Sequence, residues 1–237
     1  MNGLLIIANY NQEIEIGRLL DRAATCYPIA DTVVVDDGST DGSPLIAESK
    51  GFRVLRHEKN RGIGAGIRTG IRFAQASGYD YVVISSSNGK IQPEEIHIVT
   101  GPLLAGEADY VQGSRFLRHK DGETVPLFRR ISIPIFTLLA SIALRRRFTD
   151  ITCGFRAYKL DLFDNPKVNL DQEWLDRYEM EYYIHFWACR LGVRIKEVPV
   201  EIVYAHLEKH RRSKIKPFVG WWSMIRPFVY LTLHIKR

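Results

Sequence analysis

The stretch that most constrains the fold is TVVVDDGSTDGS, residues Thr32–Ser43. Its consecutive valines predict a buried strand, because β-branched side chains pack well on a pleated surface. Asp36 and Asp37 follow this strand directly, Gly38 permits a sharp turn, and residue types that cap helix N-termini come next. Open α/β sheets bind ligands at the carboxyl ends of their strands. The stretch therefore predicts a ligand site at the end of a strand.

Strands and helices are expected to alternate through the first half of the chain. Short apolar runs predict strands over Leu4–Ala8, Val33–Val35, Phe52–Arg56, Tyr81–Ile84 and Tyr110–Gly113. Helical spacing and helix-start residues predict helices over Glu13–Cys26, Pro44–Ser49 and Pro93–Leu104, and one that begins within 60–70 and ends at Ala76. This alternation is typical of an α/β fold with a Rossmann-like, doubly wound, mostly parallel sheet flanked by helices.

Later in the chain, we expect a helix from Tyr178 to about Leu191 and a strand over Val193–Val203. Pro199 lies within that strand and cannot donate a backbone hydrogen bond, which suggests the edge of a sheet.

Charge and cysteine content narrow the classes of function and location. The chain has 237 residues and a formal net charge of +6, which is a moderate basic excess. This excess suits phosphate-bearing ligands or an anionic membrane surface and does not require nucleic acid. The cysteines are widely spaced and form no CxxC pair, which favours reduced thiols in a cytosolic setting.

A glycine-rich segment, NRGIGAGIRTG, spans Asn60–Gly70. Its glycines resemble a phosphate-binding loop, but their spacing does not match GxGxxG and the segment does not follow the first strand. We interpret it as a helix start that packs closely against the sheet, with the glycines allowing that approach.

Seven motifs that occur in order along the chain carry a resemblance to a known family. They are ANYNQE, VVVDDGSTDG, NRGIGAGIRTG, ADYVQGSRF, DITCGFRAY, KEVPVE and RRSK. Together they resemble the family 2 glycosyltransferases of GT-A fold, and within them the polyprenyl-phosphate sugar transferases typified by dolichol-phosphate mannose synthase. The resemblance implies a UDP- or GDP-sugar donor and transfer of the sugar, with inversion, to the phosphate of a membrane polyprenol.

The resemblance also implies how the chain is divided. Residues 1–216 would form the GT-A domain, with a nucleotide-binding half over about 1–115 and an acceptor half over about 116–216. Residues 217–237 would form a membrane-proximal amphipathic tail, because aromatic and basic side chains are interleaved there.

The motifs at the ends of the first two strands are implied to bind the donor nucleotide. The positions that match the family's first-strand motif are Ala8, Asn9, Tyr10 and Gln12. The family usually has Pro-Thr and Glu in this motif, so Ala8, Asn9 and Gln12 are departures. Asp36 and Asp37 match the acids that meet the base and the ribose, and charged acceptors form strong hydrogen bonds with such donors.

The largest departure lies at SSNGK, residues Ser86–Lys90. The family has Asp-x-Asp-Gly-Gln here, and those side chains hold a divalent cation against the diphosphate. Ser86, Asn88 and Lys90 would make a poor Mg²⁺ or Mn²⁺ site, because hard cations prefer carboxylate oxygens and an ammonium group repels them. In one explanation, Lys90 supplies the positive charge to the diphosphate and the enzyme needs no metal cofactor. In the other, the protein has lost its transfer activity and only binds its ligand. We favour the first, because drift would not select a lysine.

Other basic residues match phosphate-facing positions of the family. Arg115 would face the donor diphosphate or the acceptor phosphate, and Arg129 and Arg156 are further phosphate candidates. Ser213 and Lys214 match the end of a basic segment that closes over the diphosphate in the family.

Two glutamates, Glu179 and Glu181, are compatible with either a phosphate acceptor or a saccharide hydroxyl acceptor. A phosphate acceptor is already an anion, so Glu179 or Glu181 would only orient the acceptor or the sugar hydroxyls. If the acceptor is a saccharide hydroxyl, one of them becomes the general base. The third alternative is a catalytically silent module that binds a nucleotide sugar.

An apolar run of 14 residues, Ile131–Leu144, has arginines on both sides. It is too short to span a bilayer, which takes about 20 residues. The resemblance favours an amphipathic interfacial helix that approaches the lipid acceptor, with arginines at the head groups. We therefore expect a peripheral protein at the cytoplasmic face of a membrane.

Overall fold

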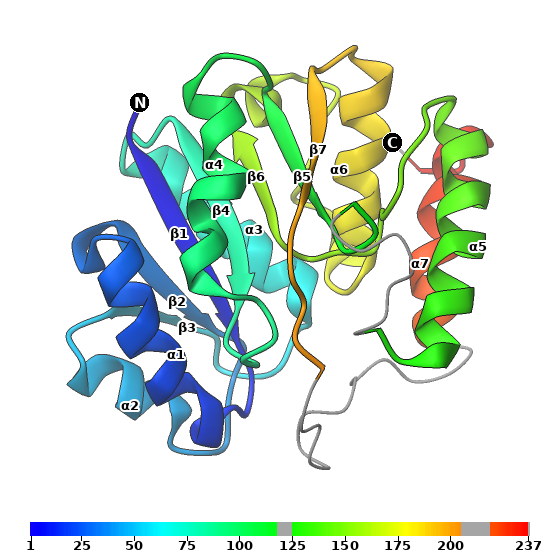
Figure 1. Cartoon of the computed structure of the whole chain (residues 1–237). Helices are drawn as coiled ribbons and strands as arrows, with labels where there is room; N and C mark the ends of the chain where they lie inside the picture. Colours follow the sequence, from blue (N-terminus) through cyan, green and yellow to red (C-terminus); the bar gives the residue numbers. More distant parts are fainter. Residues whose placement is uncertain (118–124, 205–218, 237) are drawn as a thin grey trace.

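The computed structural model describes residues 1–117, 125–204 and 219–236, and a seven-stranded sheet lies at its centre (Figure 1). The strands are β1 (Gly3–Asn9), β2 (Thr32–Asp36), β3 (Arg53–Arg56), β4 (Tyr81–Ser86), β5 (Tyr110–Ser114), β6 (Arg156–Lys159) and β7 (Ile195–Pro199). Their spatial order is β3-β2-β1-β4-β6-β5-β7. The neighbours β3, β2, β1 and β4 are parallel, and so are β5 and β7. The mostly parallel sheet predicted from the sequence is confirmed.

In the described sheet, β6 alone runs against the other strands. It pairs antiparallel with β4 on one side and with β5 on the other, so β5 is not a neighbour of β4. The sequence analysis did not predict a strand here, because β6 is defined by its pairing with β4 and β5, which are far away in the sequence. Pro199 ends β7, and β7 lies at the edge of the sheet, where Pro199 predicted it.

Helices cover both faces of the sheet (Figure 1). They are α1 (Glu13–Cys26), α2 (Ser43–Ser49), α3 (Ile63–Ala76), α4 (Ile96–Leu104), α5 (Leu127–Leu144), α6 (Glu179–Arg190) and α7 (Val219–Thr232). Short 3-10 turns span Ile29–Asp31, Pro93–Glu95, Leu160–Asp164 and Glu173–Leu175. Two hydrophobic cores result, one beneath α1, α2 and α4 and the other beneath α3 and α6.

The period-two pattern of the strands explains the two cores. In β1, Leu4 and Ile6 belong to the core beneath α3 and α6, whereas Leu5 and Ile7 belong to the core beneath α1, α2 and α4. Successive strand side chains point to opposite faces, so a strand covered on both faces is apolar throughout. This arrangement exposes the carboxyl ends of β1, β2 and β4 at one edge of the fold.

Helices α5 and α7 pack together at one side of the molecule (Figure 1). A cluster of three rings joins them to α6: Phe136 lies edge-on to Tyr182 at 5.4 Å between centroids, and Phe228 lies 5.7 Å from Tyr182. One stripe of α5 is buried against the domain, at Ile133, Thr137, Ala140 and Leu144. The opposite side, which we call the α5 apolar face, consists of Leu127, Phe128, Ile131, Ile135, Leu138, Leu139 and Ile142, all exposed.

By length and composition alone, α5 could cross a membrane, and no other helix in the described part of the chain meets that test. It begins at Leu127, four residues before the apolar run delimited from the sequence, because Arg129 and Arg130 belong to its first turn. With 18 residues at about 1.5 Å each, it is about 27 Å long, close to the ~30 Å thickness of a hydrocarbon core.

We predict that Gly70→Ala lowers the free energy of unfolding by about 1–3 kcal/mol. Gly70 lies in α3 where the helix meets β1, and an added Cβ would lie 2.7 Å from two side-chain carbons of Ile6. Gly17→Ala in α1 is the matched control, because its Cβ would meet Ile46 at an ordinary 3.5 Å. The control should gain about 0.5–1 kcal/mol from the lower chain entropy of alanine. Urea unfolding followed by circular dichroism measures both, and equal gains would contradict tight packing of α3.

Candidate active site

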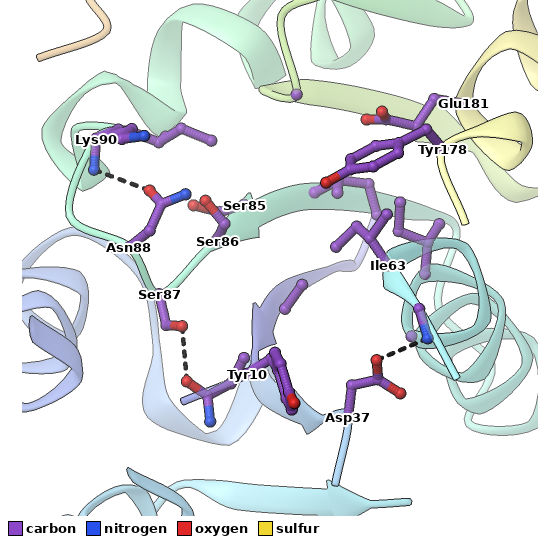
Figure 2. A pocket seen from close by; sticks show the side chains of 18 of the residues that line it. Tyr10, Asp37, Ile63, Ser85, Ser86, Ser87, Asn88, Lys90, Tyr178 and Glu181 are labelled. Carbon is purple, nitrogen blue, oxygen red and sulfur yellow. Dashed lines mark hydrogen bonds between the residues drawn. The ribbon is translucent and has the colours of Figure 1, made fainter. Parts of the chain in front are cut away.

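A cavity of about 670 Å³ lies at the carboxyl ends of β1, β2 and β4 (Figure 2). In this view, Asn88 and Lys90 lie on one side, Tyr178 and Glu181 on the other, and Tyr10 and Asp37 lie below them. The residues predicted from the sequence that line this cavity are Ala8, Asn9, Tyr10, Gln12, Asp37, Ser86, Asn88, Lys90, Arg115, Arg129 and Glu181. Chain segments far apart in sequence thus meet at the predicted edge of the sheet.

Asp36, Glu179 and Arg156 do not line the cavity, although the sequence analysis included them among the site candidates. Asp36 is fully buried behind the cavity wall, where its carboxylate accepts hydrogen bonds from the Asn9 amide at 2.7 Å and the Ser39 hydroxyl at 2.5 Å. Its acceptors are thus engaged within the protein, and Asp36 holds the β2 turn in place.

Asp37 differs from its neighbour because it reaches the cavity. Oδ1 accepts the backbone N–H of Arg61 at 2.9 Å, and Oδ2 accepts that of Gly62 at 2.8 Å. His57 Nδ1 lies 2.8 Å from Oδ1, and His57 Nε2 lies 2.9 Å from the Thr69 hydroxyl. These partners fix the direction of the carboxylate from the β3 and α3 side.

The glycines at the start of α3 permit a close approach between two backbones. A Cβ at Gly62 would collide with the carbonyl oxygen of Asp176, and one at Gly64 with that of Leu175. The Ala65 N–H donates to the same Asp176 carbonyl at 3.0 Å. The close packing predicted for this segment is present, but at Gly62 and Gly64 it is against residues 175–177 and not against the sheet.

The turn after β4 carries Ser86, Asn88 and Lys90, which the sequence analysis matched to the family's metal-binding motif. The Ser87 hydroxyl donates to Asn9 Oδ1 at 2.7 Å, and Asn88 Oδ1 accepts the Lys90 backbone N–H at 3.1 Å. In the part of the chain that the structure describes, no three His, Cys, Asp or Glu side chains are grouped as metal ligands. This turn has no carboxylate, which Mg²⁺ and Mn²⁺ prefer, and it carries an ammonium group that repels a cation, so the residues present do not fit the implied cation.

Arg115 lies in the cavity wall and is held by protein partners. Its Nε donates to Asp150 at 2.6 Å, Nη2 donates to Asp150 and Thr152, and Nη1 donates to the Tyr204 hydroxyl at 2.6 Å. Burial alone would raise the pKa of Asp150, but the adjacent guanidinium outweighs it and the pKa is lowered. Arg129 lies over the ring of Tyr204, 5.3 Å from its centroid.

Arg156 is buried and does not line the cavity. Nε donates to the carbonyl of Cys153 at 2.8 Å and Nη2 to that of Ile151 at 3.1 Å, while Nη1 lies 3.0 Å from Glu181 Oε1. Burial raises the pKa of Glu181, and Arg156 opposes this shift. A guanidinium bound to these internal partners stabilises the wall and is not presented to a ligand phosphate.

Glu179 connects α6 to α7 and does not line the cavity. Its Oε1 accepts the Ser223 hydroxyl at 2.6 Å and lies 2.5 Å from Arg226 Nη2. Of the two acids at the start of α6, Glu181 alone lines the cavity. Ser213 and Lys214 lie outside the described residues.

The sequence analysis missed several residues that shape the cavity, including His57, Tyr178 and Tyr204. His57 directly follows β3, so the rule that ligands bind at the carboxyl ends of strands could have identified it. Tyr178 and Tyr204 line the cavity from outside the first four strands, and local sequence patterns gave no sign of their position.

Comparisons with known proteins agree with this geometry. A profile described as Glycosyl transferase family 2 matches residues 4–165. Undecaprenyl-phosphate mannosyltransferase from Micrococcus luteus is 32% identical, with 90% of this chain and 88% of that protein covered. UDP-N-acetylglucosamine--dolichyl-phosphate N-acetylglucosaminyltransferase from Methanococcus voltae is 26% identical, with 89% of each covered.

A solved structure supports the assignment of the fold. Glucosyl-3-phosphoglycerate synthase from Mycobacterium tuberculosis in complex with UDP superposes with a TM-score of 0.68 at 22% identity, covering 98% of this chain and 79% of that chain. The same enzyme has also been solved with Mn²⁺ and UDP. The chain therefore belongs to glycosyltransferase family 2 and is a glycosyltransferase of GT-A fold.

Proposed function

We propose that the protein transfers a sugar, with inversion, from a nucleotide-sugar donor to the phosphate of a polyprenol at the cytoplasmic face of a membrane. The observation that carries the proposal is in the first turn of α5. Arg129 lines the cavity there, while Leu127 and Phe128 of the same turn are exposed. Relatives named for transfer to undecaprenyl phosphate and dolichyl phosphate support this acceptor class.

The first turn of α5 suits a phosphate attached to a lipid. A guanidinium binds phosphate through paired hydrogen bonds, and a helix N-terminus favours an anion. A polyprenyl phosphate bound at Arg129 could keep its chain against Leu127 and Phe128, within the bilayer surface. The acceptor would then enter the cavity without leaving the membrane.

The α5 apolar face is the proposed membrane surface. Its seven side chains are each more than half exposed, which is costly in water over one continuous face. The opposite stripe of α5 is packed on the domain, so this helix fits a bilayer surface better than a span surrounded by lipid. Arginines 129–130 lie in the first turn of the same helix and arginines 145–147 follow its last turn, and basic side chains at both ends suit anionic head groups.

We predict that Leu138→Asp combined with Ile142→Asp lowers binding to vesicles of phosphatidylglycerol and phosphatidylcholine by at least about tenfold. Both side chains belong to the α5 apolar face and are exposed, so the free energy of unfolding should fall only by the lower helix propensity of aspartate, about 1 kcal/mol for the pair. Leu45→Asp on α2, equally exposed and on a different surface, is the control and should bind normally. Flotation assays measure the bound fraction. Unchanged binding by the double variant would place the membrane surface elsewhere.

The proposed reaction needs charge stabilisation more than proton transfer. A phosphate oxygen of the acceptor attacks the anomeric carbon, and the bond from that carbon to the nucleoside diphosphate breaks. The bonding electron pair leaves with the diphosphate, whose growing negative charge is stabilised by Lys90, with Ser86 and Asn88 as hydrogen-bonding neighbours. We assign this role to Lys90 because the side chains of the turn after β4 do not fit a divalent cation.

A saccharide hydroxyl acceptor is the second candidate, and Glu181 is the residue that favours it. A hydroxyl must lose its proton, and Glu181 lines the cavity with a pKa raised by burial. Its Oε1 lies beside Arg156, however, which favours a wall position over proton transfer. Assays that offer undecaprenyl phosphate in vesicles and soluble glycosides in parallel separate the two acceptor classes.

We predict that transfer of labelled sugar to undecaprenyl phosphate, tested with a panel of UDP- and GDP-sugars, persists in excess chelator. Lys90→Gln should lower kcat by about 10²–10³-fold, because a charged donor to the leaving group is lost. Lys90→Arg should retain more activity, and Lys167→Gln, on an exposed surface away from the cavity, should behave as the wild type.

Two outcomes would contradict the proposal. Activity that disappears with chelator and returns with Mn²⁺ would restore a metal to the β4 turn. Nucleotide binding without transfer to either acceptor class, for every donor tested, would make the protein a silent binding module.

A further inference from the structure

The Asp37 carboxylate lines the cavity, and its protein partners determine how many further hydrogen bonds it can accept from a ligand. Each oxygen of a carboxylate can accept two hydrogen bonds. Asp37 Oδ1 has two protein partners, His57 Nδ1 and the Arg61 N–H, whereas Oδ2 has one, the Gly62 N–H. Within the described residues, therefore, one acceptor position remains, and it is on Oδ2.

The second nitrogen of His57 determines how the imidazole is used. The Thr69 hydroxyl can donate to Nε2, which leaves the proton of a neutral ring on Nδ1. Nδ1–H then donates to Asp37 Oδ1. His57 is nearly buried in this position, so its hydrogen bond persists without competition from bulk water. His57 thus occupies an acceptor site of Asp37 and also fixes the rotation of the carboxylate.

This arrangement bears on which nucleobase the carboxylate can bind. The hydrogen-bonding edge of uracil has one N–H between two carbonyl groups, and a single acceptor satisfies it. The edge of guanine has a ring N–H beside an amino group, and a carboxylate pairs with both only by using both oxygens. Oδ1 of Asp37 is already saturated by protein donors, so a guanine would leave one donor unpaired.

We propose that Asp37, held by His57, selects a uridine diphosphate sugar over a guanosine diphosphate sugar. The inference rests on the proposed function, because it takes the cavity as the donor site. Tyr10 lines the same cavity as Asp37 and offers an aromatic ring for the base (Figure 2). An unpaired buried donor weakens binding enough to give a preference of about 10- to 100-fold for UDP.

Calorimetric titration of the full chain with UDP and with GDP, each with and without Mn²⁺, tests the selection. The wild type should bind UDP at least about tenfold more tightly than GDP. His57→Leu should bring the ratio of the two Kd values toward one, since Oδ1 then keeps only the Arg61 N–H and each carboxylate oxygen has one acceptor position for the ligand. His57→Asn is the matched control, because its amide keeps a donor near the position of Nδ1 and should preserve the ratio.

The measured quantity is the ratio of the Kd values for GDP and UDP. If His57 has only a structural role, His57→Leu would weaken the binding of both nucleotides and leave this ratio unchanged. That result would overturn the proposal. Equal or tighter binding of GDP by the wild type also overturns it, as expected if Asp37 meets the ribose instead of the base. In that case the donor site stands. If neither nucleotide binds with or without Mn²⁺, the proposed function fails together with this inference.

Discussion

The side chain of Asn9 connects the carboxyl ends of three strands, and the cavity depends on this connection. Its Nδ2 donates to Asp36 at the end of β2 at 2.7 Å and to Ser43 at the start of α2 at 2.9 Å. Its Oδ1 accepts the hydroxyl of Ser87 after β4 at 2.7 Å. A buried amide is costly unless its groups are paired, so these bonds favour one relative position of the three loops. Tyr10, Asp37 and Asn88 each follow one of these hydrogen-bonded residues in the sequence, so the same hydrogen bonds position them at the cavity.

Charged residues in the motifs that resemble the family perform two different tasks in this fold. Arg115 and Arg156 are buried and each is bound to protein acceptors, so their charges organise the cavity wall. Removing one partner of such a pair would leave the other charge uncompensated. Arg129, by contrast, lies half-buried in the first turn of a surface helix and lines the cavity. Motif membership alone does not distinguish these tasks, whereas burial and partners do.

Much of the fold could be predicted because its signals are local. The apolar runs and helix-start residues of the first 115 residues located the strands and the helices α1 to α4 within a few positions. β6 escaped prediction because its place between β4 and β5 is set by pairing with distant strands. Asp37 was identified from the rule that ligands bind at the carboxyl ends of strands, whereas Asn88 was identified through the resemblance to the family. The burial of Asp36, Glu179 and Arg156 depends on tertiary packing that the sequence pattern does not express.

The insertion of β6 also sets an order of events when the chain is made. β4 acquires its second neighbour only when residues Arg156–Lys159 have been synthesised, about 70 residues after β4 itself. Until then, the nascent chain carries an unpaired backbone edge beside an apolar strand, and such edges invite association with other chains. A pause of the ribosome between β4 and β6 would prolong the time during which this edge is unpaired.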